Sequence, residues 1–406
     1  MRLLIILVWV FGLSTSHACQ TDEDCSLNGI CVPNPKTIQH STTAKACECD
    51  PGWVGDSCGV LDLAPATRYS GYNHTNFTKP DDFGPYGNSS WGGRILQDPK
   101  NASVFHLFTS QFGKGCGLSG WRPHSHIIRA ESYTGPQGPY HWAQDVTTST
   151  GFRHNPDVVF SPVDRKYLMY SIGVEAPEFT ECKSFTYKDW PNNISVASAD
   201  NIRGPWTDWK VIVDSDFNKD LPVRATNPSP FPLWTPDNPT SDIALLIKDY
   251  NIYTASAWNT TYEQVHEASW VTAAENDTPY WTEDPFIWRD KRGNWHSLNH
   301  WMIDLVEFNA QQWPRVGSHL FARNLTGPWH FPLKTAFTSN VTYEDGSWEL
   351  LRRRERPKLY FSNDGEMTPM YLVTGVQDTF DGSGRSFTHI QPIGTKWRDF
   401  EKAIWP

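Results

Sequence analysis

A short apolar segment that carries a proline near its start repeats along most of this chain. It appears as HNPDVVF, TNPSPFP, EDPFIWR and ERPKLYF, with the prolines at Pro156, Pro228, Pro285 and Pro357. After a turn, each copy is followed by a second apolar segment, and these read KYLMYSI, IALLIKDY, NWHSLNHW and PMYLVTGV. Self-similarity at intervals of 57 to 72 residues is typical of architectures in which one supersecondary unit recurs.

An earlier segment, WGGRILQDPKNASVFHLFTS, has the same strand–turn–strand form without the proline. Three units continue into a Gly-Pro-aromatic turn, at Gly138, Gly204 and Gly327. The pattern predicts five units of about four strands each, and such sheets need neighbours to cover their faces and edges. We therefore expect an all-β fold, with a five-bladed β-propeller over residues 85–406. A β-sandwich would not explain the recurring proline segment. The best helical candidate is VTYEDGSWELLRRRERP.

Composition agrees with short strands and excludes several classes of protein. The chain has 20 Trp, 30 Pro and 28 Gly, which is too aromatic for a disordered chain and too rich in Pro and Gly for a helical bundle. A net charge of −10 argues against a nucleic-acid partner, because phosphates require a basic face. Beyond the amino terminus there is no apolar run of 18 residues, so we expect no membrane span.

The amino terminus predicts secretion. Residues 1–18 combine a positive start at Arg2, an apolar stretch and the small-residue site Ser16-His17-Ala18, as in a cleaved signal peptide. The alternative of a membrane anchor would need more than about 11 apolar residues to cross a bilayer of ~30 Å. Nine Asn-x-Ser/Thr acceptors indicate glycosylation on surface loops of an extracellular protein. They are Asn73, Asn76, Asn88, Asn101, Asn193, Asn259, Asn276, Asn324 and Asn340.

Six of the eight cysteines fall within residues 19–60 and predict a small disulfide module. A zinc site is the alternative, but no histidine spacing supports it, and six cysteines allow 15 connectivities. The segment CECDPGWVGDSC resembles the end of an epidermal-growth-factor-like (EGF-like) module, and such modules serve as spacers or contact an extracellular partner. This resemblance implies the pairs Cys19–Cys31, Cys25–Cys47 and Cys49–Cys58.

The remaining two cysteines, Cys116 and Cys182, stand apart from the others. As the two leftover thiols, they are expected to pair and to join blade 1 to blade 2. Residues 61–84 are expected to form a linker between the disulfide module and the propeller.

The Asp-Pro first strands and Gly-Pro-Trp turns resemble those of the five-bladed glycoside hydrolases, family 43 and the related family 32, over roughly residues 85–400. The resemblance implies that an oligo- or polysaccharide binds in a central funnel lined by the first strand of each blade. It also implies an Asp base from blade 1, an Asp from blade 2 and a Glu acid from a later blade. Cleavage requires two carboxyl groups in different protonation states.

Glu283 matches the position of the family's acid, so we expect Glu283→Gln to abolish turnover. Asp284 is expected to raise the pKa of Glu283 or to bind a sugar hydroxyl, and Glu355 lies in the same register in the fifth unit. Blade 1 departs from the family at Trp91-Gly92-Gly93-Arg94, and blade 2 departs at His154-Asn155-Pro156. If all five first strands line one funnel, the funnel contains Arg94, His154, Asn155, Asn227, Glu283, Asp284, Glu355 and Arg356.

Two arginines among these funnel residues suggest a ligand with negative charge. Guanidinium groups bind carboxylate or sulfate in a bidentate manner, so Arg94 and Arg356 would clamp an acidic or sulfated glycan. The alternative is an internal salt bridge between Arg356 and Glu283. Trp91 is expected to lie against a sugar face. No cofactor is expected, although a structural calcium ion held by His154 is an alternative.

Two functions remain open at this stage. One is a secreted glycoside hydrolase, and the other is a catalytically silent propeller that binds glycans or an extracellular protein. The carboxylate-rich funnel favours the enzyme, and the missing aspartates of blades 1 and 2 favour the binding protein. The separation of the funnel carboxyl groups distinguishes them, since retaining and inverting enzymes use ~5–5.5 and ~6.5–9.5 Å.

Overall fold

The computed structural model describes residues 19–34, 45–73, 79–148, 151–175, 179–182, 190–214, 226–267, 281–302, 316–378 and 384–405. The expected signal peptide and the acceptors Asn76 and Asn276 lie outside these residues. The seven other glycosylation acceptors all occupy exposed or half-exposed positions. Among the described residues, no helix combines the length and apolar character that crossing a bilayer would require.

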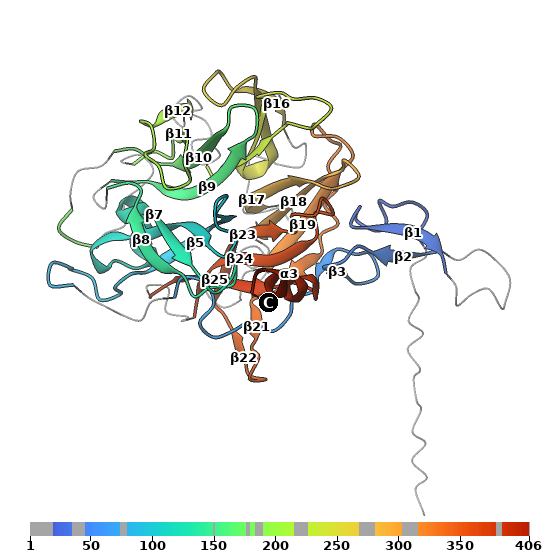
Figure 1. Cartoon of the computed structure of the whole chain (residues 1–406), viewed down its shortest axis with the longest axis horizontal. Coiled ribbons are helices and arrows are strands. Elements are labelled where there is room, and N and C mark those ends of the chain that lie inside the picture. The colour runs from blue at the N-terminus through green and yellow to red at the C-terminus, as the bar shows by residue number, and fades with distance from the viewer. Residues whose placement is uncertain are drawn as a thin grey trace, which may run out of the picture.

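Five antiparallel sheets follow one another along the chain and are arranged around a common centre (Figure 1). Blade 1 consists of β5 (Ser90–Gln97), β6 (Phe105–Phe112), β7 (Ser125–Ser132) and β8 (His141–Asp145). Blade 2 consists of β9 (His154–Ser161), β10 (Lys166–Ile172), β11 (Ile194–Ala199) and β12 (Lys210–Val213). Blade 3 consists of β13 (Ser229–Pro232), β14 (Ile243–Ile247), β15 (Asn251–Ala255) and β16 (Glu263–His266).

The last two blades complete the ring. Blade 4 consists of β17 (Thr282–Arg289), β18 (Trp295–Trp301), β19 (Val316–Ala322) and β20 (Thr335–Phe337). Blade 5 consists of β23 (Arg353–Phe361), β24 (Pro369–Gln377) and β25 (Phe387–Pro392). The segment before blade 1 lies along β25 through bridges at Leu63 and Tyr72, so both ends of the chain contribute to the closure of the ring. This segment belongs to the stretch that the sequence indicates as a linker.

The predicted all-β fold with five blades is confirmed, and the proline segments form the first strand of their blades. The three Gly-Pro-aromatic turns lie between the third and fourth strands of blades 1, 2 and 4. The helical expectation for VTYEDGSWELLRRRERP is wrong. This stretch forms a hairpin of β21 (Asn340–Thr342) and β22 (Trp348–Leu350) and the start of β23, because Asp345-Gly346 makes a tight turn in its middle. The longest described helix is α3 (Lys396–Ile404), which packs on blade 5.

Each pair of neighbouring blades encloses its own hydrophobic cluster. Phe108 of blade 1 meets Met169 of blade 2, and Leu168 of blade 2 meets Leu245 of blade 3. Ile252 of blade 3 meets Leu320 of blade 4 in a further cluster. Full burial of such side chains contributes about 1.5–3 kcal/mol each. The inner strands are therefore fixed at the axis by apolar contacts on both sides of every sheet.

The disulfide module contains β1 (Gly29–Pro33), β2 (Lys45–Cys49), β3 (Trp53–Val54) and β4 (Val60–Leu61). The predicted pairs Cys19–Cys31, Cys25–Cys47 and Cys49–Cys58 are confirmed. Cys116 and Cys182 also pair, and they join the β6–β7 connection of blade 1 to the β10–β11 connection of blade 2.

The module packs directly on blades 4 and 5. Trp53 is 6% exposed, and its ring stacks on Trp288 of β17 at a centroid distance of 6.3 Å. Trp53 also lies 4.9 Å from the ring of His319. At the edge of this contact, Arg292 donates to the Leu27 carbonyl at 2.6 Å and forms an ion pair with Asp50. The module and the propeller therefore share one hydrophobic cluster.

Candidate active site at the propeller axis

One residue within or just before each innermost strand has a left-handed backbone, and these residues occupy matching positions in all five blades. In blades 2 to 5 the residue directly precedes the repeated proline. The residues and their φ angles are Gly92 (65°), Asn155 (58°), Asn227 (56°), Asp284 (54°) and Arg356 (58°). In blades 1, 2, 4 and 5 the register with the second strand shifts at this point, as in a β-bulge. The repeated feature is therefore a kink as well as a proline.

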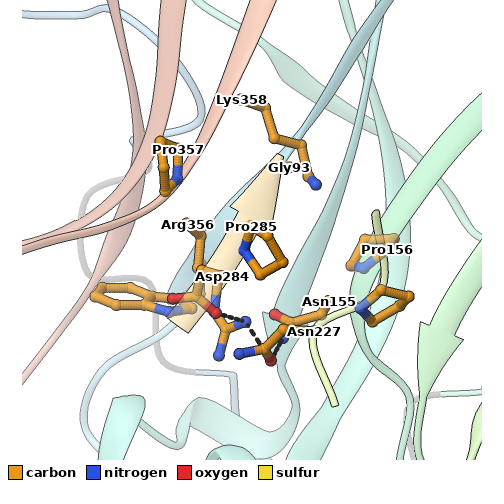
Figure 2. A pocket seen from close by; sticks show the side chains of 11 residues that line it. Gly93, Asn155, Pro156, Asn227, Asp284, Pro285, Arg356, Pro357 and Lys358 are labelled. Carbon is orange, nitrogen blue, oxygen red and sulfur yellow. Dashed lines mark hydrogen bonds and ion pairs between the residues drawn. The ribbon is translucent and has the colours of Figure 1, made fainter. Parts of the chain in front are cut away.

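The side chains of these kinked residues meet at the axis (Figure 2). Asn155 Nδ2 donates to Asn227 Oδ1 at 2.7 Å, and Arg356 Nη1 donates to the same oxygen at 3.3 Å. Arg356 Nη1 also lies 2.8 Å from Asp284 Oδ1. Blades 2, 3, 4 and 5 are thus connected by one polar network. We call these residues, together with Gly92, the axial ring.

Blade 1 contributes a glycine to the axial ring for a steric reason. A Cβ atom built on Gly92 would lie 3.0 Å from Cβ and 3.3 Å from Cδ of Arg356. The aliphatic stem of Arg356 therefore crosses the place where a blade 1 side chain would stand. This accounts for the absence of the aspartate that the family resemblance implies for blade 1.

A second set of charged side chains lies around the axis, two residues further along the inner strands. Lys358 Nζ lies 2.6 Å from Asp157 Oδ2, and Arg94 Nε lies 4.0 Å from Asp157 Oδ1. The guanidinium of Arg94 also lies 4.7 Å from the ring centre of Phe286. Burial lowers the pKa of Lys358, and Asp157 acts in the opposite direction. Arg94 is therefore held within the protein by an aromatic ring and a carboxylate.

Glu283, directly before Asp284, is paired with a lysine. Its Oε1 atom lies 2.9 Å from Nζ of Lys248, which belongs to η4 (Lys248–Tyr250) and is 1% exposed. Burial acts to raise the pKa of Glu283, but Lys248 and His300 outweigh it and bring the pKa to about 2. Glu283 is ionised near neutral pH. Its surroundings are thus the opposite of those expected for the proton donor that the sequence resemblance assigns to it.

Asp284 has the environment of a proton donor. The residue is 5% exposed, and burial raises the pKa of its carboxyl group to about 6. Arg356 acts to lower this pKa, whereas the neighbouring carboxylates of Glu283 and Glu355 raise it. The salt bridge expected between Arg356 and Glu283 forms with Asp284 instead. Two adjacent carboxyl groups therefore have widely separated pKa values, an arrangement that supports acid and base roles.

Glu355 provides a third carboxyl group from blade 5. Its Oε1 atom accepts from Arg353 at 3.1 Å, and its Oε2 atom lies 4.0 Å from His300 Nδ1. Asp284 Oδ2 lies 3.9 Å from the same nitrogen. These two oxygens are therefore no more than about 8 Å apart, which is below the upper limit of ~9.5 Å for the carboxyl pairs of glycosidases.

Glu283, Asp284 and His300 each offer a ligand atom within 4.8 Å of the others. A cation bound there would compete with Lys248 and Arg356 for the carboxylate oxygens. His154, the sequence-based candidate for a calcium ligand, lies away from this group. Its Nδ1 atom is 2.7 Å from Ser125 Oγ, and its ring lies 4.7 Å from that of Trp121. Burial lowers the pKa of His154 well below its ordinary value, so the ring is neutral.

The structure brings four of the eight expected funnel residues, together with Trp91, into one cavity at the axis. Trp91, Asn155, Asn227, Asp284 and Arg356 line one cavity. The cavity among them has a volume of about 20 Å³, which holds one or two waters. Among the described residues, neither Asn155 Oδ1 nor Asp284 Oδ2 has a hydrogen-bond partner, so water bound in this cavity would satisfy them.

Sequence analysis missed several charged groups at the axis, of which Lys248, His300 and Asp157 matter most. His300 lies opposite Glu283 in the pairing of β17 with β18. Aligning the two apolar segments of this unit as an antiparallel pair could therefore have placed His300 beside Glu283. Asp157 follows the repeated proline of blade 2 and could have been found from the period of the repeat. For Lys248, no motif or spacing in the sequence gives a signal.

No family model matches the sequence, and no curated protein matches it. Solved structures with a similar fold include a thermostable family-43 glycoside hydrolase, with 13% identity and a TM-score of 0.47, covering 78% of this chain and 92% of that one. An exo-β-1,3-galactanase from Phanerochaete chrysosporium has 14% identity and a TM-score of 0.46, covering 80% and 64%. A xylan β-1,4-xylosidase from Bacillus halodurans has 15% identity and a TM-score of 0.48, covering 75% and 53%.

The first of these neighbours is described as a member of family 43, the family that the sequence resembles. At such identities and TM-scores, the assignment of any chemistry to this chain depends on its own axial residues.

Proposed function

We propose that this protein is a secreted glycoside hydrolase that cleaves a glycan at the propeller axis. The observation that carries the proposal is the placement of the Asp284 and Glu355 carboxyl groups about His300, with Glu283 held beside Lys248 at 2.9 Å. Burial raises the pKa of Asp284, whereas Lys248 lowers that of Glu283. Asp284 would protonate the leaving-group oxygen, and Glu355 would act as the second carboxylate. Burial raises the pKa of Asp284, and the ionised Glu283 adds to this effect, so both favour a proton on the donor.

A neutral glycan fits this site better than an acidic or sulfated one. Arg356 lies 2.8 Å from Asp284, and Arg94 lies 4.0 Å from Asp157. An anionic sugar would have to replace these internal carboxylates before either guanidinium could bind it. The pairing of all eight cysteines supports the extracellular setting, since disulfides persist in oxidising compartments.

The second candidate function is a propeller that binds a glycan without cleaving it. It is favoured by the small space at the axis and by the hydrogen bonds that join Asn155, Asn227 and Arg356 across it. A sugar ring would have to displace these side chains to reach Asp284. Blade 1 also contributes a glycine where the family resemblance implies a carboxylate.

Incubation of the purified protein with a panel of neutral oligosaccharides at pH 5 tests the proposal. We expect release of reducing sugar by the wild type and a loss of 10²–10⁴-fold in the Asp284→Asn variant, the range typical for general acid catalysis. An aryl glycoside with a good leaving group needs little protonation, so it should be cleaved by both proteins. Oligosaccharide binding without release of product would instead support the binding propeller.

A further inference from the structure

A second cavity lies at the outer part of blade 1, away from the axial ring. Its free space is about 300 Å³, against about 20 Å³ at the axis when measured in the same way. The cavity is formed where β6 ends, where β7 begins and where the outermost strand β8 runs, together with residues 79–88. This volume is at the lower end of the range for small-molecule sites and accommodates one or two sugar rings.

An exposed aromatic ring stands at this blade 1 cavity in a fixed orientation. Trp142 of β8 is 52% exposed, and its Nε1 atom donates to Asp145 Oδ1 at 3.1 Å. Asp145 Oδ1 also lies 3.6 Å from Nε2 of His126. About half of the indole surface therefore remains open to solvent. A planar apolar face beside hydrogen-bonding groups suits the C–H face of a pyranose.

The polar groups around the cavity offer hydrogen bonds, and three carboxylates (Asp81, Asp82 and Asp145) against two lysines (Lys79 and Lys114) disfavour an anionic ligand. Gln111 accepts from the Tyr72 hydroxyl at 2.8 Å, and its Nε2 atom lies 3.4 Å from His126 Nε2. Lys114, which also lines the cavity, is paired with Asp81 at 2.8 Å. Amide, imidazole and carboxylate groups at such short range bind hydroxyl groups as both donors and acceptors. An uncharged polyhydroxyl ligand matches this combination.

The cavity is separated from the axial ring by a hydrophobic wall. Phe112 lines the cavity and belongs to a buried cluster with Trp91 and Leu118. On the axial side, the ring of Phe112 lies 6.2 Å from that of His154. A ligand in the blade 1 cavity would therefore not contact Asp284 or Glu355. The inference made here is independent of whether the axis catalyses hydrolysis.

We propose that the blade 1 cavity is a second saccharide site, which binds a neutral mono- or disaccharide with Trp142 as the stacking surface and Asp145 and Gln111 as hydrogen-bonding groups. The saccharide has two possible sources. One is a free glycan. The other is the chain's own glycan at Asn88, because this predicted acceptor lines the same cavity.

Saturation-transfer NMR with four probes tests the site: the methyl glycosides of glucose, galactose and mannose, and N,N′-diacetylchitobiose. We expect at least one probe to bind the wild type or the Asn88→Gln variant. Binding by both indicates a free glycan, and binding of chitobiose only after Asn88→Gln indicates that the chain's own glycan fills the cavity.

Two substitutions show whether that binding uses this cavity. Trp142→Ala should weaken it at least tenfold, and Asp145→Asn should weaken it while keeping the shape of the site. The matched control is Trp348→Ala, which removes another exposed indole (66% exposed) far along the chain on β22 and should leave binding unchanged. Absence of binding by both the wild type and Asn88→Gln, or unchanged binding by Trp142→Ala, would overturn the proposal.

Discussion

Lys248 Nζ lies 2.9 Å from Glu283 Oε1, and this ion pair determines which of two adjacent carboxyl groups holds a proton. With Lys248 beside it, Glu283 has a pKa of about 2 and remains ionised. The negative charge of Glu283 then adds to the burial that raises the pKa of Asp284 to about 6. The lysine therefore acts on Asp284 through Glu283, although it comes from a different blade.

The first prediction concerns the pH dependence of activity. If Asp284 is the proton donor, kcat/KM should be highest below about pH 6 and should fall about tenfold per pH unit above it. Glu283→Gln removes the charge that raises this pKa, so the fall should begin at a lower pH while turnover is retained below it. The measurement is a pH–rate profile on one neutral oligosaccharide for both proteins.

This result would separate two assignments of the proton donor. The family resemblance predicts that Glu283→Gln abolishes turnover, whereas the observed ion pair predicts a shifted profile. A folded Glu283→Gln protein without activity at any pH, together with an active Asp284→Asn protein, would return the donor role to Glu283.

The two carboxyl groups also make the stability of the fold depend on pH, in opposite directions. The folded protein binds the Asp284 proton more tightly than the unfolded chain does, because the pKa is raised from 3.8 to about 6. The contribution of Asp284 to the free energy of unfolding is therefore greatest below pH 3.8 and decreases as the pH rises to about 6. For Glu283 the pKa is lowered from 4.5, so its contribution is present above pH 4.5 and is lost as the pH falls toward 2.

The second prediction is that Lys248→Met destabilises the fold more than removal of both partners does. Lys248 is 1% exposed, so its loss leaves the Glu283 carboxylate without its cation in a largely buried position. Breaking a buried pair from one side typically costs about 3–5 kcal/mol. Urea unfolding at pH 7 of Lys248→Met, Glu283→Gln and the double variant completes a double-mutant cycle. Additive losses, in which the double variant loses the sum of the two single losses, would show that the pair does not stabilise the protein.

The proline segments predicted the inner strands of four blades, and the strand–turn–strand form of WGGRILQDPKNASVFHLFTS predicted the fifth. Pro156, Pro228, Pro285 and Pro357 all stand one position after a kinked residue, so one local backbone feature is repeated with the fold. The disulfide pairs followed from the resemblance of the CECDPGWVGDSC segment to a known module. Local patterns of this kind can be recognised in the sequence because the residues that form each of them lie close together in one unit.

Side-chain contacts between different blades produce no such pattern in the sequence. Lys248 comes from η4 in blade 3, yet it pairs with Glu283 of blade 4, and no spacing connects them. Similarly, Gly92 replaces an expected aspartate because the stem of Arg356 passes over it from blade 5. The prediction of a helix around Asp345 was wrong. Apolar and charged residues alternate there along a hairpin, and over so short a stretch this pattern resembles the 3.6-residue period of a helix.

The third prediction tests the axial ring through its glycine. Gly92→Ala should destabilise the protein for two reasons: the left-handed φ of 65° and the approach of the new Cβ to Arg356 Cβ at 3.0 Å. The backbone cost alone is about 1–2 kcal/mol for a non-glycine residue. Gly346→Ala is the matched control, since φ is 80° there and no atom lies within 4 Å of the new Cβ. Thermal unfolding should place Gly92→Ala below Gly346→Ala, and equal midpoints would mean that Arg356 moves aside without cost.

The last prediction concerns the contact between the disulfide module and the propeller. Trp53 is 6% exposed and stacks on Trp288 of blade 4, so Trp53→Ala should open a cavity in the cluster that the two parts share. Truncation of a buried tryptophan typically costs about 3–5 kcal/mol. Its neighbour on β3, Val54, is 39% exposed and serves as the control, because Val54→Ala removes few buried contacts.

Calorimetry under non-reducing conditions should give one cooperative transition for the wild type and for Val54→Ala. For Trp53→Ala we expect a lower midpoint and a separate transition of the propeller, because the module no longer contributes its face of the cluster. The six cysteines keep the module intact in every variant, so the difference reports docking rather than the folding of the module itself. A Trp53→Ala protein that melts as the wild type does would show that the module is attached to the propeller by the chain alone.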